Sequence, residues 1–95
     1  MARDFGLRDQ MRRASVSIMS NIAEGFESRT EKLFLEFLGR AKASAGELRA
    51  KVYIAHDVGY LKKLEFDEIF DPVDKCSRQL SCFMTYLRGS KVEAL

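Results

Sequence analysis

Apolar side chains recur every three or four residues along most of this chain, and that spacing constrains its fold more than any other feature. One stripe lies between residues 31 and 58: Phe34, Phe37, Leu38, Ala41, Ala45, Leu48, Val52 and Ala55. Another lies between residues 7 and 24: Leu7, Met11, Ala14, Ile18 and Ile22. A third lies between residues 64 and 88: Phe66, Ile69, Val73, Cys76, Leu80, Phe83 and Leu87. Because about 3.6 residues complete a helical turn, this pattern predicts amphipathic helices.

Glycines and capping residues indicate where these helices end. We expect Gly25 to end the first helix in a left-handed C-terminal cap, and Gly59 to end the second. Ser28 begins a capping-box pattern ahead of the second helix, with Thr30 as the competing N-cap. Pro72, the only proline, is expected to kink the third helix or to mark the start of its regular part.

These signals predict an all-α fold. We expect one domain over residues 1–95, an up-and-down antiparallel bundle of three long helices with no strand. The helices are predicted near residues 7–24, 31–58 and 64–88. The predicted core residues are Phe34, Leu48, Val52, Ile69, Leu80 and Phe83.

The charge balance restricts the classes of partner. The chain has 16 basic and 14 acidic residues, for a net charge of +2. This balance excludes a polybasic tail but allows a local basic surface. No apolar run approaches the roughly 20 residues of a membrane span, and no secretion leader is evident. We therefore expect a cytoplasmic protein.

Candidate catalytic and metal-binding residues are few. Cys76 and Cys82 lie six positions apart, so on a helix they point about 120° apart and cannot form a disulfide. Cys76 is expected in the core and Cys82 on the surface. His56 is the only histidine, which leaves no zinc ligand set, and its neighbour Asp57 points about 100° away. We predict no enzymatic activity and no cofactor.

Small residues form a second face on the middle helix. Gly39, Ala43, Gly46 and Ala50 lie opposite the apolar stripe. Glycine inside a helix costs up to about 1 kcal/mol, which suggests close approach by another backbone. That backbone belongs either to a neighbouring helix of the same chain or to another subunit. The predicted subunit contacts are Gly39, Ala43, Gly46, Ala50 and Met19.

The first helix has a basic edge. Arg8, Arg12, Ser15 and Met19 share one face, bordered by Val16. Such an edge suits solvent, a subunit contact or phosphate groups. Arg8 and Arg12 are one turn apart, with bases about 6 Å apart, near the spacing of successive phosphates. The residues predicted to contact nucleic acid are Arg3, Arg8, Arg12 and Arg13, the last projecting elsewhere.

Four segments, residues 4–18, 20–27, 37–48 and 59–61, resemble a bacterial four-helix-bundle family. This family is known from proteins encoded in intervening sequences of large-subunit ribosomal RNA genes. It is similar to the accessory variability protein of diversity-generating retroelements. The resemblance implies a homopentamer of unknown function, suspected to bind nucleic acid or a nucleic-acid enzyme, with no established catalysis.

The chain departs from that family in two places. The family has a further helix ahead of the segment that begins at Phe5, and Met19 stands where the family has a proline. Without the first helix, apolar faces would stay uncovered, which favours self-association or partner binding.

Two functions remain open. One is a module that binds structured RNA or DNA, favoured by the clustered arginines and by the resemblance. The other is a protein-interaction scaffold, or an accessory subunit of a nucleic-acid enzyme such as a reverse transcriptase. The near-neutral charge favours this second function.

Overall fold

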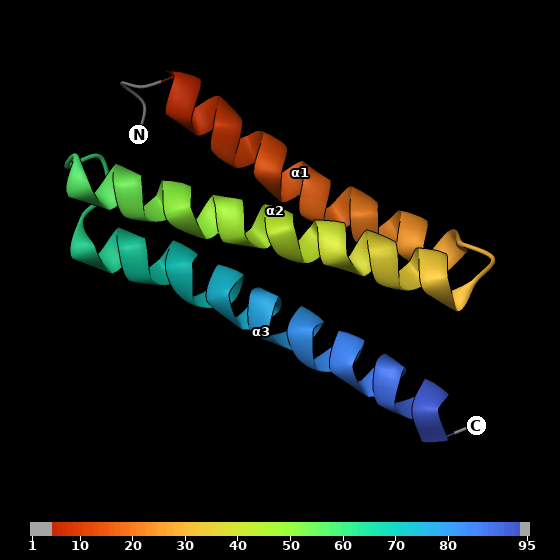
Figure 1. Cartoon of the computed structure of the whole chain (residues 1–95). Helices are drawn as coiled ribbons and strands as arrows, with labels where there is room; N and C mark the ends of the chain where they lie inside the picture. The colour runs from red at the N-terminus through yellow and green to blue at the C-terminus, as the bar shows by residue number, and fades with distance from the viewer. Residues whose placement is uncertain (1–4, 94–95) are drawn as a thin grey trace.

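The chain folds into three helices that run alternately up and down (Figure 1). The computed structural model describes residues 5–93, with α1 at Phe5–Glu27, α2 at Glu31–Asp57 and α3 at Lys63–Glu93. No strand occurs within this range. The predicted all-α fold of three helices is confirmed. Helix α2 begins as predicted and ends one residue earlier, whereas α1 and α3 extend beyond their predicted bounds at both ends.

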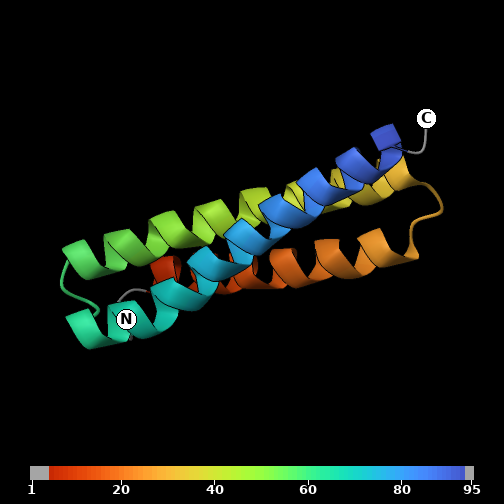
Figure 2. The same cartoon turned by 90° about the horizontal axis from the view of Figure 1, so that it is seen from below.

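The middle helix α2 holds the other two together. Both α1 and α3 pack against α2, yet no Cα atom of α1 lies within 8 Å of one in α3 in the described chain. Figure 2 shows α3 crossing the other two helices diagonally. The Cα atoms span 52 × 20 × 14 Å, so the molecule is a long, thin layer rather than a closed bundle.

The core follows the apolar stripe of α2. Its buried residues there are Leu38, Ala41, Ala45, Leu48, Val52 and Ala55. Three of these six residues are alanines, whose small side chains let the flanking helices approach the α2 backbone closely. Leu61, in the turn before α3, closes the core at one end and is also buried.

Gly25 does not end α1, contrary to the prediction. The helix continues to Glu27, and Gly25 is buried within it. A Cβ atom at this position would lie 3.0 Å from Cδ1 of Phe34 and 3.3 Å from Cβ of Phe37. Glycine is therefore needed here for the close approach of α2, not for a left-handed backbone.

Gly59 does provide the predicted left-handed stop after α2. Its φ is 86°, the one positive φ among the described residues. Its N–H donates to the carbonyl oxygen of His56 at 3.0 Å. Such a conformation strains residues that carry a Cβ, which is why glycine suits this position.

Thr30 is the N-cap of α2. Of the two predicted capping residues, Thr30 is therefore correct and Ser28 is not. The Thr30 hydroxyl accepts a hydrogen bond from the Leu33 N–H at 3.1 Å. The Ser28 hydroxyl instead donates to the carbonyl oxygen of Gly25 at 2.6 Å, which satisfies the end of α1. One short connection therefore caps both helices.

Helix α3 begins ahead of Pro72 and continues through it. The Glu65 carboxylate accepts the Lys62 N–H at 2.9 Å and caps the first turn. In that turn Lys63 donates to Asp67 at 2.7 Å, and this hydrogen bond raises the pKa of Lys63. The interpretation that the regular helix starts at Pro72 is wrong, because the α3 cap already forms at residues 62–65.

The predicted core of α3 is partly wrong. Leu80 is buried as expected, but Phe83 is 36% exposed and Met84, at 8%, takes its place. A stripe that alternates strictly by three and four drifts about 20° per seven residues around a straight helix. By the C-terminal part of α3 this drift has turned Phe83 to the edge of the contact with α2, where its ring still packs against Phe34 at 5.8 Å between centroids. Phe34 and Ile69, also predicted as core, are only half-buried.

Candidate nucleic-acid interface

Arg12 and Arg13 converge on one carboxylate of α1. Nε of Arg13 lies 2.9 Å from Oδ2 of Asp9, and Nη2 of Arg12 lies 3.5 Å from Oδ1 of Asp9. Both arginine side chains remain largely exposed, at 72% and 80%. We predicted that Arg13 projects away from Arg12, but Asp9 binds both guanidinium groups and holds them at one surface. Together Arg12, Arg13 and Asp9 carry one net positive charge.

Arg13 also borders a polar groove between α1 and α2. The groove has a volume of about 350 Å³ and is lined by Gln10, Arg13, Ala14, Ser17, Ser44, Glu47 and Lys51. Its lining combines two cations and one anion with hydroxyl and amide groups. A phosphodiester needs these donor types, because its oxygens accept hydrogen bonds from arginine, lysine, serine and glutamine.

A hydrogen bond between α1 and α2 lies at the lining of the groove. The hydroxyl oxygens of Ser17 and Ser44 lie 2.8 Å apart. Nδ2 of Asn21 donates to the Ser17 carbonyl at 2.8 Å and to its hydroxyl at 3.1 Å. The Ser17–Ser44 contact joins α1 to α2 at the polar lining, and the Asn21 bonds hold Ser17 in place from within α1.

Sequence reasoning missed the α2 side of this groove. Ser44, Glu47 and Lys51 follow one another at steps of three and four, the spacing of one helix face. That spacing was available in the sequence, but it indicates a polar face only. The pairing of that face with Arg13 of α1 depends on how the two helices pack.

The 23S rRNA-intervening sequence protein family matches residues 1–82. The chain belongs to this family. The family predicted from the resemblance is therefore confirmed, and its description names no enzymatic activity. No curated protein matches the sequence.

A solved structure supports the fold of this intervening-sequence protein. It is a protein of unknown function of the S23 ribosomal protein family from Bacteroides thetaiotaomicron. The two share 19% sequence identity with a TM-score of 0.85, over 87% of this chain and 77% of that one. At this identity the likeness concerns the arrangement of helices.

The small-residue face of this family member is open within one chain. Ala43 and Ala50 are exposed, and a Cβ at Gly46 would meet no atom within 4 Å. Only Gly39 has a neighbour, because its Cβ would lie 3.7 Å from Cε of Met84. Packing of this face against helices of the same chain is therefore wrong beyond Gly39, and its use as a subunit contact stays a prediction.

The remaining residues considered in the sequence analysis are Arg3, Arg8 and His56. Arg3 lies outside the described residues. Arg8 is exposed, and its contact with phosphate stays a prediction. His56 packs its ring against Phe66 at 4.8 Å between centroids, and its Nδ1 lies 3.8 Å from Oδ1 of Asp57. That separation exceeds hydrogen-bond length, so the two do not form an acid–base pair.

The described part of the chain shows no disulfide and no metal-binding cluster. Cys76 is half-buried and Cys82 exposed, and both are free thiols. Within residues 5–93, no three His, Cys, Asp or Glu side chains are placed to hold a metal ion. No helix in the same range is long and apolar enough to span a membrane.

Proposed function

We propose that this family member is a non-catalytic module that binds the phosphate backbone of structured RNA along the α1–α2 groove. The observation that carries this proposal is the position of Arg13. It belongs both to the arginine pair around Asp9 and to the edge of the polar groove that also includes Lys51. The family's name refers to 23S rRNA, which supports RNA as the first ligand to test.

The charges around the α1–α2 groove determine how tightly RNA is expected to bind. Arg12, Arg13 and Lys51 supply three positive charges, while Asp9 and Glu47 supply two negative ones. Phosphate binding driven by so small an excess is weak and depends strongly on salt. Contacts to phosphates carry no sequence information, so we expect little sequence specificity.

A salt titration of binding to an RNA hairpin tests this function. We expect log affinity to fall linearly with log salt, by about 0.9 per phosphate contact on a duplex. The double variant Arg13→Ala with Lys51→Ala should flatten that slope by up to about two contacts. Arg78→Ala is the matched control, because Arg78 pairs with Asp74 on α3, away from the groove. Equal slopes for the double variant and the parent would refute the assignment.

The second candidate is an accessory role in which the chain binds a nucleic-acid enzyme. It is favoured by the acidic partners, because Asp9 and Glu47 offset most of the positive charge at the groove. A parent protein that binds neither RNA nor DNA at low salt would favour this role. The two free thiols support action in the reducing cytoplasm in either case.

A further inference from the structure

A second hollow continues the polar groove toward the end of the molecule where α1 begins and α2 ends. It has a volume of about 370 Å³ and is lined by Gly6, Leu7, Gln10, Ile54, Val58 and Tyr60. Gln10 also lines the polar groove, so the two hollows meet at this residue. On α2 the lining residues of both hollows follow at steps of three and four: Ser44, Glu47, Lys51, Ile54 and Val58. The two hollows therefore form one groove along a single face of α2.

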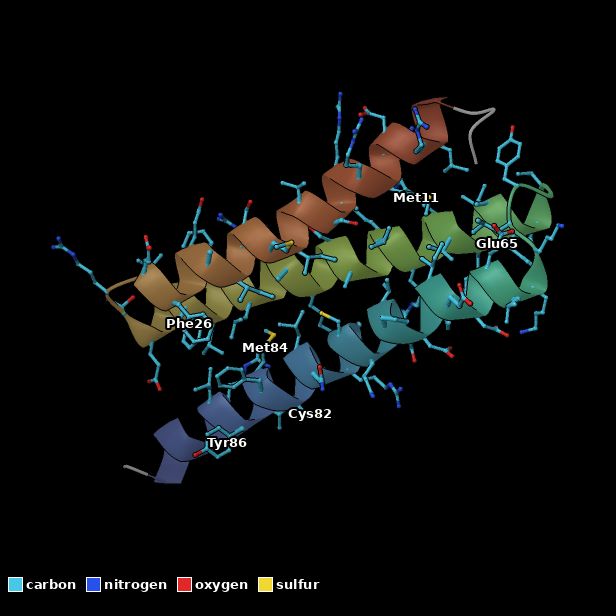
Figure 3. All side chains as sticks on the ribbon, turned by 180° about the vertical axis from the view of Figure 1, so that it is seen from behind. Met11, Phe26, Glu65, Cys82, Met84 and Tyr86 are labelled. Carbon is cyan, nitrogen blue, oxygen red and sulfur yellow. The ribbon has the colours of Figure 1, made fainter. Side chains whose placement is uncertain are left out.

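The second hollow, which we call the apolar half of the groove, differs from the polar groove in chemistry. Its α2 side consists of two aliphatic side chains that are partly open to solvent, Ile54 at 50% and Val58 at 56%. Among its lining residues, polar side chains are limited to the Gln10 amide and the Tyr60 hydroxyl. Met11, which follows Gln10, lies between α1 and α2 and packs on the core (Figure 3). Gln10 itself is exposed and lies at the rim of the groove.

The turn after α2 places Tyr60 at the end of the apolar half. The Gly59 N–H donates to the His56 carbonyl oxygen at 3.0 Å, and the Tyr60 N–H donates to the Ala55 carbonyl oxygen at 2.8 Å. These two hydrogen bonds form a Schellman motif, which the left-handed backbone of Gly59 permits. Tyr60 also packs against the core. The turn that ends α2 thus holds an aromatic ring at the groove.

From this arrangement we infer that the apolar half holds the base of one unpaired RNA nucleotide, whose phosphate lies between Arg13 and Lys51. This inference rests on the proposed RNA binding and names the kind of RNA that fits. Unpaired bases in loops and bulges stack on aromatic side chains and form hydrogen bonds through their edges. Tyr60 and Ile54 offer a surface for the base, and the Gln10 amide both donates and accepts hydrogen bonds at its edge.

The spacing of the two halves suits a single nucleotide. Gln10 precedes Arg13 by three residues and Lys51 precedes Ile54 by three, so each pair is separated by about 4.5 Å along its helix axis. Only the sugar separates a phosphate from the base of the same nucleotide. Glu47 lies one turn beyond Lys51, on the side away from Ile54, so the cations adjoin the apolar half. A fully paired stem cannot fill both halves, because its bases stay stacked within the duplex.

Binding to two blunt-ended RNA duplexes of the same sequence tests this inference, one fully paired and one with a single adenosine bulge. We expect the bulged duplex to bind about tenfold more tightly at the same salt concentration, which is the contribution of one stacked base. The salt slopes for the two duplexes should be similar, because the base carries no phosphate charge of its own. An abasic nucleotide at the bulge keeps the bend of the duplex and should lose the gain.

A variant of α2 tests whether the base lies in the apolar half. Ile54→Ala should reduce the tenfold preference for the bulge to about threefold or less, with unchanged affinity for the paired duplex. Its helical circular dichroism should stay intact, because Ile54 is half exposed. Leu33→Ala is the matched control, since it truncates a 42% exposed aliphatic side chain near the other end of α2 and should keep the full preference.

The possible contrary results separate this inference from the proposed function. Equal affinity of the parent for both duplexes, or an abasic bulge that keeps the gain, would overturn base binding and leave phosphate binding in place. Equal weakening of both duplexes by Ile54→Ala would assign Ile54 to another contact, such as one between subunits, and would also overturn it. A parent that binds neither duplex at low salt would contradict both the base site and the proposed RNA binding.

Discussion

The hydroxyl of Ser17 on α1 lies 2.8 Å from the hydroxyl of Ser44 on α2, and this contact connects the two helices at the lining of the proposed interface. Both side chains are partly buried. A polar pair in this position orients α1 against α2 more specifically than apolar packing does, because a hydrogen bond fixes both distance and direction. It therefore aligns Arg13 with Lys51.

The Ser17–Ser44 contact predicts a modest stability effect. Ser44→Ala should lower the free energy of unfolding by about 1 kcal/mol, since it leaves the Ser17 hydroxyl without its partner across the helices. Asn21 still donates to Ser17, which limits the loss. Urea denaturation measures this change. Changing Ser20, an exposed serine of α1, to Ala is the control, and an equal loss in both variants would contradict the role of the contact.

Truncation of a buried leucine of α2 should lower the free energy of unfolding by more than the loss of the serine contact does. Leu48 is 6% exposed and packs within the cluster formed with α1 and α3. Leu48→Ala should lower the free energy of unfolding by about 2–5 kcal/mol, through lost apolar burial and the cavity left behind. Leu33, on the same helix, is 42% exposed, and Leu33→Ala should cost much less. Similar losses for both leucines in denaturant titrations would contradict the assigned core.

Gly25 and Gly46 should respond oppositely to alanine. At Gly25 a Cβ would lie 3.0 Å from the Phe34 ring, so Gly25→Ala should destabilise the protein by about 1 kcal/mol or more. At Gly46 the space is open, and Gly46→Ala should stabilise the helix by about 0.5–1 kcal/mol. Thermal unfolding should show Tm changes of opposite sign, and changes of the same sign would disprove the close approach at Gly25.

Gly59 should be sensitive to alanine for a conformational reason. Its φ of 86° lies in the left-handed region, where a Cβ costs about 1–2 kcal/mol. Gly59→Ala should therefore destabilise the protein although nothing lies within 4 Å of the added carbon. Gly59→Asn should recover part of the loss, because asparagine tolerates this region better. Equal stability of all three proteins in urea would contradict the assignment.

The sequence predicted the helices well because each apolar stripe persists over several turns. It could not distinguish Gly25 from Gly59, since both stand where an apolar stripe ends. The difference is tertiary: α2 packs against Gly25, whereas Gly59 has open space around it. The drift that exposes Phe83 and buries Met84 likewise depends on how straight α3 remains against α2.

The candidate site was only half predictable. Arg12 and Arg13 were identifiable because they cluster along one segment of the chain. Lys51, 38 positions beyond Arg13, joins them only when α1 and α2 pack antiparallel in one particular register. Periodicity indicates which face of a helix is apolar, but not which polar faces of two helices adjoin.

RNA binding along the α1–α2 groove is tested by titrating the isotope-labelled protein with an RNA hairpin at low salt and following the amide nuclear magnetic resonance signals. We expect the largest chemical-shift changes around Arg13 and Ser17 on α1 and around Ser44 and Lys51 on α2, and we expect them to diminish as salt is added. Amides around Arg78 on α3 should change little. An unchanged spectrum at low salt, or changes centred on α3, would contradict RNA binding along the α1–α2 groove.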